Sequence, residues 1–401
     1  MKPITVKDVK TFITAPGRCD LLVVKVETSE PGLYGLGCAT FTQRIQAVKT
    51  AIDEYLRPMM IGRDVDNIED AWQVMYGSSY WRNGPVLNNA ISGIDMALWD
   101  IKGKVANLPV YSLLGGKCRP AARIFGGAHA ATKEEMGDEV EKILATGQQY
   151  IRLFLGRFGA SEVAEEEKPI GALPGHYINP KKYIKDMTEM FAYLRERFGD
   201  DPEYMIDVHE RLSPTETIQL AKALEPYHLY FLEDSLAPEN IEWFANLRAA
   251  VSTPLAMGEL FNNVNEYKSL IVNRQIDFIR CHISQLGGLT PAKKLAAFCE
   301  YFGVKTIWHG PGDLTPIGMA AQLHLDLATP NFAFQEHMGW SDLIYEMFPG
   351  APEMKGLYMY PNDKPGFGVD FNEELAAKYP AKGYKGDMFM ARLSDGAAVR
   401  S

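Results

Sequence analysis

The chain has 401 residues, of which 46% are hydrophobic and 23% charged, as is ordinary for a globular protein. Its net charge of −10 and lack of a basic stripe exclude a typical nucleic-acid partner, and no apolar run approaches the roughly 18 residues of a membrane span. The five cysteines are scattered without CxxC spacing, which argues against a disulfide framework or a zinc site. We expect a cytoplasmic protein, because the N-terminus lacks the apolar core of a signal peptide.

Residues 1–118 are predicted to form an α+β domain. Three strands are expected, at 4–14, 20–27 and 33–39, and they read as an antiparallel meander. Apolar residues then recur at three- and four-residue steps, at Ile45, Val48, Ile52 and Leu56. This spacing is typical of one face of a helix, and a second helix is expected at 86–106.

From about residue 120 strands and helices alternate. Strands are expected at 151–155, 204–207, 229–233, 255–258, 278–282, 304–309 and 332–336. Repeated βα units form either a doubly wound sheet or a TIM barrel. The number of strands, the polar residues at their carboxyl ends and the lack of GxGxxG after the first favour an α/β fold with a barrel at 119–350.

Two further segments are expected to serve this barrel. The loop at 156–180 is long and rich in Gly, Pro and Glu, so we expect it to cover or line the active site. The tail at 351–401 is rich in Pro, Gly and Lys and is expected to pack on the N-terminal domain.

Three carboxylates end strand-like runs at even intervals. Asp207, Glu233 and Glu259 are 26 residues apart (233 − 207 and 259 − 233), about one βα unit. Parallel strands of a barrel bring their carboxyl ends to one rim. Converging carboxylates repel one another unless a cation lies between them, and oxygen-only ligands suit Mg²⁺. The sequence therefore predicts a magnesium site.

Two histidines are candidate acid–base groups. His209 follows Asp207 by two residues, which puts it on the same side of an extended strand, beside the metal. An imidazole there can act as general acid or base near neutral pH. His309 ends another strand and opens a Gly- and Pro-rich loop, in which Asp313 could orient it or bind substrate.

Three more strand-end residues are candidates for the site. Glu336 ends the last expected strand and could accept hydrogen bonds from substrate hydroxyls, and Arg280 lies near the end of the strand expected at 278–282. Arg152 lies within the strand at 151–155. A buried, unpaired Arg is costly, so a carboxylate partner is expected for it.

Several segments carry a family resemblance. Residues 90–104, AISGIDMALWDIKGK, resemble the signature helix of the mandelate racemase and muconate lactonizing branch of the enolase superfamily. The carboxylate triad matches the Mg²⁺ ligands of that superfamily. The mannonate dehydratase subgroup, which includes starvation-sensing and galactonate dehydratase family members, is similar at 80–85, 237–240, 258–262, 309–316 and 375–380. The resemblance implies an N-terminal α+β capping domain on a modified TIM barrel.

The resemblance also implies an activity. A Mg²⁺-dependent dehydratase of this kind abstracts the proton next to a sugar acid's carboxylate, stabilises the enediolate and eliminates the β-hydroxyl, giving a 2-keto-3-deoxy acid. His209 would assist departure of the hydroxyl, and Arg152 would belong to the pair of residues that acts as the base. Substrate contacts would come from His309, Arg280, Asp313, Glu336, Thr42 and His129. A homo-oligomer, from dimer to octamer, is implied as well.

Departures from the family pattern leave alternatives open. The loop at 156–163 has no Tyr, although the subgroup's dehydratases use one there, and Thr42 replaces the usual Asn. One alternative is racemisation, epimerisation or cycloisomerisation, but those branches usually carry Lys where this chain has Arg152 and Arg280. The other is a sugar-acid binding or sensing protein with little or no dehydratase activity.

Overall fold

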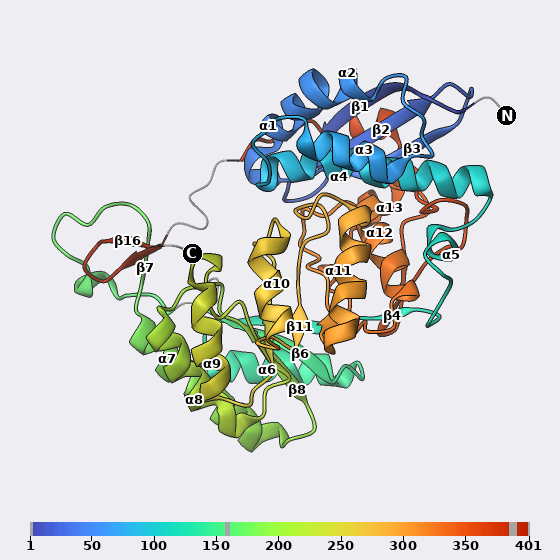
Figure 1. Cartoon of the computed structure of the whole chain (residues 1–401). Coiled ribbons are helices and arrows are strands. Elements are labelled where there is room, and N and C mark those ends of the chain that lie inside the picture. The colour runs from blue at the N-terminus through green and yellow to red at the C-terminus, as the bar shows by residue number, and fades with distance from the viewer. Residues whose placement is uncertain (1–2, 157–160, 385–390, 400–401) are drawn as a thin grey trace. The chain divides into compact units, whose positions relative to one another are not determined.

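The structure is a computed structural model that describes residues 3–156, 161–384 and 391–399 (Figure 1). The chain forms two compact units. Unit 1 contains Met1–Ile124, Leu260–Asn265 and Arg280–Tyr384, and unit 2 contains Phe125–Glu259, Glu266–Ile279 and Lys385–Ser401. None of the described helices combines the length and apolar character that crossing a lipid bilayer requires.

Unit 1 begins with the predicted antiparallel meander. Its strands are β1 (Val6–Thr14), β2 (Leu21–Thr28) and β3 (Tyr34–Cys38), paired in the order β1-β2-β3. The long helix α4 (Pro85–Ala106) packs on β2 and β3. The approach is close because Gly35 and Gly37 of β3 have no side chains. A Cβ at either would collide with the backbone of α4.

The helix predicted from the periodic apolar residues is present, in three consecutive parts. They are α1 (Ile45–Thr50), the π-helix η2 (Ala51–Leu56) and α2 (Arg57–Met60). All four residues of the predicted face, Ile45, Val48, Ile52 and Leu56, are buried. The apolar face therefore predicted the helix, although not the π-helical segment within it.

The rest of unit 1 consists mainly of helices and one small sheet. Its other elements are η1 (Thr42–Arg44), α3 (Ile68–Gly77), α5 (Val110–Leu113), β4 (Ala122–Arg123), α11 (Leu289–Phe302), β12 (Lys305–Thr306), α12 (Pro316–Ala328), α13 (Asp342–Met347), β13 (Glu353–Lys355), β14 (Tyr358–Tyr360) and α14 (Glu373–Ala376). Strands β13, β14 and β4 pair antiparallel. In Figure 1 the elements from α11 onward are orange to red, whereas α3 is blue.

Unit 2 is built on parallel strands. They are β5 (Gly126–Ala130), β6 (Tyr150–Leu155), β8 (Glu203–Asp207), β9 (Phe231–Glu233), β10 (Leu255–Met257) and β11 (Phe278–Ile279), with β11-β10-β9-β8-β6-β5 as their order in the sheet. Every neighbouring pair is parallel. Parallel strands of this kind are covered on both faces, and their apolar residues are correspondingly buried.

Helices connect these strands, as the alternating pattern predicts. They are α6 (Lys133–Ala145), α7 (Pro180–Phe198), α8 (Pro214–Leu224), η4 (Glu225–Tyr227), η5 (Pro238–Trp243), α9 (Phe244–Ala250) and α10 (Val264–Val272). Successive helices from α6 to α9 pack side by side (Figure 1). A capping box fixes the start of α8, since Ser213 and Glu216 each satisfy a backbone amide of the other.

One predicted strand is absent, and one strand of the parallel sheet was not predicted. The segment 332–336 forms no strand and makes only isolated bridges, from Phe332 to Thr306 and from Gln335 to Ile124. In the opposite direction, the sequence analysis missed β5. Its first two residues, Gly126 and Gly127, have low strand propensity, so the strand owes its conformation to pairing along β6.

The loop expected at 156–180 contains regular structure, although its residues 157–160 lie outside the described part. It includes η3 (Glu165–Glu167) and β7 (His176–Ile178). The strand β7 pairs in parallel with β15 (Ala391–Leu393), which pairs in turn with β16 (Ala398–Val399). The expected cover of the active site by this loop stays a prediction.

The tail expected at 351–401 divides between two partners. Lys25 of β2 forms an ion pair of 2.5 Å with Glu373 of α14, and Thr14 donates a hydrogen bond to the carbonyl of Ala376. These contacts join the tail to the meander within unit 1. Residues 391–393 pair with β7 in unit 2 instead, and residues 398–399 pair with 391–392. The domain boundaries at 118 and 350 stay predictions.

One buried carboxyl in unit 1 predicts a pH effect on stability. Asp95 of α4 is fully buried and accepts a hydrogen bond from the backbone N–H of Thr290 in α11. Burial raises the pKa of Asp95 from 3.8 to about 7. Between these two values the folded protein keeps a proton that the unfolded chain has lost, so stability falls as pH rises from about 4 to 7.

Asp95→Asn is therefore expected to remove this fall, at about 1.4 kcal/mol per pKa unit. Asn cannot ionise but still accepts the Thr290 hydrogen bond through its Oδ1 atom. Urea unfolding at pH 5 and pH 8 measures the effect. The stability of the variant relative to wild type should be higher at pH 8 than at pH 5, and an equal difference at both values would contradict the prediction.

Candidate metal and acid–base site

The first two predicted carboxylates lie side by side in unit 2. Asp207 ends β8 and Glu233 ends β9, and the two residues are direct partners in the parallel register. Both side chains are buried, at 2% and 0% exposure. Glu259 follows β10 after a turn at Gly258, whose φ of 142° suits glycine. The strand-end pattern thus placed two of the carboxylates on strands and the third just beyond one.

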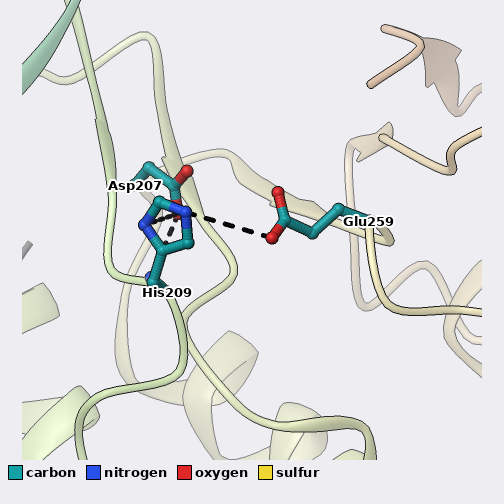
Figure 2. A group of neighbouring side chains, drawn as sticks. All are labelled: Asp207, His209 and Glu259. Carbon is teal, nitrogen blue, oxygen red and sulfur yellow. Dashed lines mark hydrogen bonds and ion pairs between the residues drawn. The ribbon is translucent and has the colours of Figure 1, made fainter. Parts of the chain in front are cut away.

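The carboxylates belong to two groups that could each hold a metal ion. In the first, ligand atoms of Asp207, His209 and Glu259 all lie within 4.8 Å of one another (Figure 2). In the second, atoms of Asp207, Glu233 and Asp234 do so. Within the described part of the chain the expected ligands Asp207, Glu233 and Glu259 are thus divided between two groups that share Asp207.

Electrostatics favour a cation at this place. Burial raises the pKa of Asp234 well above its ordinary value, and the charges of Glu259, Asp207 and Glu233 raise it further. Asp234 accepts a hydrogen bond of 3.2 Å from Gly258, while its Oδ2 atom has no hydrogen-bond partner among the described residues. Crowded buried carboxylates resist ionisation unless positive charge is near. A donor set of carboxylate oxygens fits a hard divalent ion such as Mg²⁺.

Arg152 of β6 supplies one positive charge. Its Nη1 atom lies 3.2 Å from both carboxylate oxygens of Glu233 and 3.7 Å from Oδ2 of Asp207. The side chain is buried, as are both partners. The carboxylate partner predicted for a buried Arg is therefore confirmed.

His209 lies beside two carboxylates. Its Nδ1 atom is 3.4 Å from Oδ1 of Asp207 and its Nε2 atom 3.9 Å from Oε1 of Glu259 (Figure 2). The neighbourhood agrees with the prediction, but the reason given for it was wrong. Strand β8 ends at Asp207, and the chain then turns.

The turn after β8 has unusual backbone angles. His209 and Glu210 both have positive φ, of 49° and 58°. The His209 amide donates a hydrogen bond of 3.0 Å to Oδ1 of Asp207, which helps to hold the turn. Such backbone costs of the order of 1–3 kcal/mol per residue and is concentrated at functional sites.

His129 lies on β5 of the same unit. Its ring stacks on that of Phe154 in β6, with centroids 4.5 Å apart and planes inclined by 2°. Burial and the charge of Arg152 lower the pKa of His129. The structure thus brings together, within unit 2, the three expected metal ligands, Arg152, His209 and His129.

The remaining candidates lie in unit 1, where Arg280 and Glu336 form an ion pair close to His309. Nη2 of Arg280 is 2.6 Å from Oε2 of Glu336, and the Gly310 amide donates to the same oxygen at 3.1 Å. His309 precedes Gly310; its own amide donates to the carbonyl of Cys281, and its ring lies 5.6 Å from that of His282. Glu336 is therefore held by backbone and by Arg280.

Asp313 and Thr42 also meet within unit 1. The Thr42 amide lies 3.5 Å from Oδ2 of Asp313, a long hydrogen bond. Burial raises the pKa of Asp313 from 3.8 to about 6, and this hydrogen bond opposes the rise. Two residues 271 positions apart in sequence, both expected to bind substrate, are thus neighbours.

Glu336→Gln is expected to destabilise the protein by about 3–5 kcal/mol, because it breaks the buried ion pair that Glu336 forms with Arg280 at 2.6 Å. Arg280→Met together with Glu336→Gln should cost less than the single change, since both charges of the pair are then removed. Urea unfolding of the three proteins measures both effects. In the exposed pair of Lys142 and Glu139, Glu139→Gln serves as a control that should leave stability unchanged.

Asp234 was not among the metal ligands predicted from the sequence. The structure puts its carboxyl with those of Asp207 and Glu233. The signal that could have found it is the pair of consecutive acids at 233–234. Alternation along a strand does not apply here, because Asp234 lies beyond the end of β9 and has a φ of 39°.

Two family models match the chain. Residues 2–115 match the mandelate racemase / muconate lactonizing enzyme N-terminal domain, and residues 135–375 match the enolase C-terminal domain-like family. A solved structure of an enolase from Pantoea ananatis, with bound D-gluconate and Mg, is 52% identical, covers 99% of this chain and 100% of that one, and has a TM-score of 0.97. A putative dehydratase from Salmonella enterica superposes with a TM-score of 0.83 at 25% identity, over 94% of this chain and 99% of its own.

Curated relatives agree over the full length. A D-galactonate dehydratase family member of Musicola paradisiaca is 51% identical, and one of Pantoea ananatis is 52% identical, each over 100% of both chains. The fold is thus the expected one, a capping domain followed by an α/β barrel domain. With identity at this level over both domains, the chain belongs to the D-galactonate dehydratase family of the enolase superfamily.

Proposed function

We propose that this protein is a Mg²⁺-dependent acid-sugar dehydratase that converts an aldonic acid into its 2-keto-3-deoxy acid. The observation that carries the proposal is the cluster of buried carboxylates with Arg152 and His209 beside it. Membership of the D-galactonate dehydratase family and the gluconate- and Mg-bound structure of a relative support it.

The metal would be held by Asp207, Glu233 and Glu259, with Asp234 adjoining them. Their oxygens are of the type that Mg²⁺ prefers. When bound, Mg²⁺ supplies positive charge that stabilises the enediolate formed from the substrate carboxylate. The buried position of Asp207 and Glu233 keeps water away from that charge and so strengthens its effect.

The chain's own residues would handle the protons. Arg152, fixed against Glu233 at 3.2 Å, would belong to the pair that removes the proton next to the carboxylate. His209 would donate a proton to the departing β-hydroxyl, since an imidazole can hold one near neutral pH. Its Nδ1 atom lies 3.4 Å from Oδ1 of Asp207, and its Nε2 atom is on the side of Glu259.

Further roles extend to residues whose assignment rests on their strand-end positions and the family resemblance. We assign catalysis to His309 and substrate binding to Arg280, Asp313, Glu336, Thr42 and His129. Arginine and carboxylate side chains are suited to a sugar acid, because they bind its carboxylate and its hydroxyls respectively.

The proposed substrate is a mannonate- or gluconate-type hexonate. The relative with bound D-gluconate favours a six-carbon acid. We further expect a cytoplasmic homo-oligomer, from dimer to octamer, and native mass measurement tests the assembly.

A library of hexonates and pentonates, incubated with purified protein and Mg²⁺ and assayed for 2-keto acids, tests this function. Product from at least one hexonate is expected, and chelation of Mg²⁺ should stop its formation. If no library member is converted while Mg²⁺ is bound, the dehydratase proposal fails. Tight binding of a hexonate without turnover would favour a sugar-acid binding or sensing role, and C2 deuterium exchange without keto acid would favour racemisation or epimerisation.

A further inference from the structure

Phe154 lies beside His129, Arg152 and His209, although its sequence position on a buried strand suggests only a core residue. It is paired with His129 in the register of β5 and β6. The two rings are stacked almost parallel at 4.5 Å. Phe154 is buried, at 8% exposure, whereas His129 is exposed. The exposed imidazole thus stacks on the face of the buried phenyl ring.

The Arg152 side chain packs on the same ring. Because residues two apart on a strand point to one side, the side chains of Arg152 and Phe154 lie on the same face of β6. The guanidinium carbon of Arg152 lies 4.8 Å from the ring centroid of Phe154, within the range of a cation–π interaction. Gly127, the register partner of Arg152, has no side chain to compete for this space.

His209 completes the surroundings of the ring. Its imidazole centroid lies 6.1 Å from that of Phe154, with the planes inclined by 39°. One apolar side chain therefore contacts the residue proposed for proton removal and the residue proposed for substrate binding, and it adjoins the proposed general acid. No other aromatic side chain in the described residues has ring contacts with all three.

We propose that Phe154 is a positioning residue that fixes the Arg152 guanidinium and the His129 imidazole for the dehydration. This inference rests on the proposed function. The aromatic face packs against both groups but forms a conventional hydrogen bond with neither. The guanidinium therefore stays directed at Glu233, and the imidazole edge stays available to the substrate. Small displacements of such groups strongly reduce rates, because reacting atoms must be held close to their productive geometry.

The variants Phe154→Leu and Phe154→Tyr separate positioning from simple core filling. Leu fills much of the space but has no π face, while Tyr keeps the ring. Phe244→Leu is the matched control, since Phe244 is a fully buried Phe of the same unit with no ring contact to His129, Arg152 or His209 among the described residues. Thermal unfolding compares the three variants, and Phe154→Leu should lose no more stability than Phe244→Leu.

Steady-state kinetics of the Mg²⁺-loaded enzyme on its best hexonate then gives the main readout. For Phe154→Leu we expect at least a tenfold lower kcat and a raised KM, with Phe154→Tyr and Phe244→Leu within about twofold of wild type. His129→Gln should raise KM alone, and adding it to Phe154→Leu should raise KM less than it does in wild type. Equal kcat in Phe154→Leu and Phe244→Leu would overturn the proposal.

Two further measurements do not depend on turnover. In protein with ¹³C-labelled histidine, the His129 ring protons should be shifted upfield in wild type and Phe154→Tyr, and should move downfield in Phe154→Leu; an unmoved signal would overturn the stack. If wild type converts no hexonate, the proposed function fails, and titration of the Mg²⁺-loaded proteins with D-gluconate decides this inference instead. At least tenfold weaker binding to Phe154→Leu than to Phe154→Tyr would support it, and equal or absent binding would overturn it.

Discussion

Asp207→Asn is expected to lower kcat/KM by at least about a thousandfold and to abolish stabilisation by Mg²⁺. Asp207 is the residue shared by the two clusters of side chains that could hold a metal ion. A bound divalent ion contributes several kcal/mol to stabilising the charge of an enediolate, and each 1.36 kcal/mol is a factor of ten in rate. Because Asn keeps the shape of the side chain, the loss would come from charge and ligation.

The variant should show the opposite trend in metal-free buffer. There the carboxylate of Asp207 adds repulsion to a cluster in which its charge already raises the pKa of Asp234. Asn removes that repulsion, while Glu233 still pairs with Arg152. We therefore expect metal-free Asp207→Asn to be at least as stable as the metal-free wild type.

Thermal unfolding with and without Mg²⁺ separates these effects. Wild type should gain about 2.7 kcal/mol at a Mg²⁺ concentration one hundred times its Kd, and Asp207→Asn should gain none. Glu203→Gln is the matched control, since Glu203 begins the strand that Asp207 ends. Retained stabilisation by Mg²⁺ in Asp207→Asn would remove Asp207 from the metal site.

Strand ends were the most predictable part of the site. An apolar run followed by an acid located Asp207 and Glu233 correctly, because parallel strands of one sheet carry their carboxyl ends to the same edge. The cost of an unpaired buried charge was enough to predict a carboxylate partner for Arg152. Both inferences use physics that depends only on residue type and strand direction.

The turn after β8 was less predictable, because residue type and strand direction do not determine its backbone. His209 and Glu210 both adopt positive φ, a conformation that is uncommon for any residue other than Gly, although Asn, Asp and His adopt it more often than the rest. Only the surrounding contacts, such as the bond from the His209 amide to Asp207, select that backbone. An extended strand was the natural expectation, and it happened to place His209 in the correct neighbourhood.

The role inferred for Phe154 depends on register, which the sequence did not contain. The partner strand β5 starts with two glycines and was not recognised, so nothing paired Phe154 with His129. A Phe in a buried strand then indicates only core packing. Its position between an imidazole and a guanidinium became visible when both strands were aligned.

The motif at 90–104 illustrates what family resemblance adds to pattern. Its small residue Gly93 lies where a Cβ would collide with the Val24 side chain of β2, so the motif encodes the docking of α4 on the meander. Helical periodicity predicts the helix but not this docking. The capping domain was predicted from the family resemblance, and the match of residues 2–115 to the N-terminal domain model supports this prediction.

His209→Asn is expected to lower the rate of 2-keto acid formation by about 10²–10⁴-fold, the usual contribution of a general acid. The Asn side chain cannot protonate the leaving hydroxyl. Asp207, Glu233 and Glu259 remain, so stabilisation by Mg²⁺ should persist. A loss of Mg²⁺ binding in this variant would instead make His209 a ligand, as its place in the first carboxylate group allows.

The same variant distinguishes the two proton transfers. If Arg152 belongs to the pair that removes the C2 proton, then abstraction should continue when the acid is missing, and the enediolate should be reprotonated from solvent. In D₂O, NMR of the substrate should therefore show deuterium at C2 without a matching amount of keto acid. The wild-type enzyme should form keto acid with less exchange into remaining substrate, because elimination competes with reprotonation.

Equal loss of exchange and elimination would contradict this division of labour. It would mean that His209 also takes part in removing the proton, or that its ring orients the substrate before either step. Arg152→Met is the complementary control, since it should suppress exchange and elimination together. Because that change also removes the ion pair between Arg152 and Glu233, the stability of the variant must be compared at saturating Mg²⁺, where the ion offsets the lost positive charge.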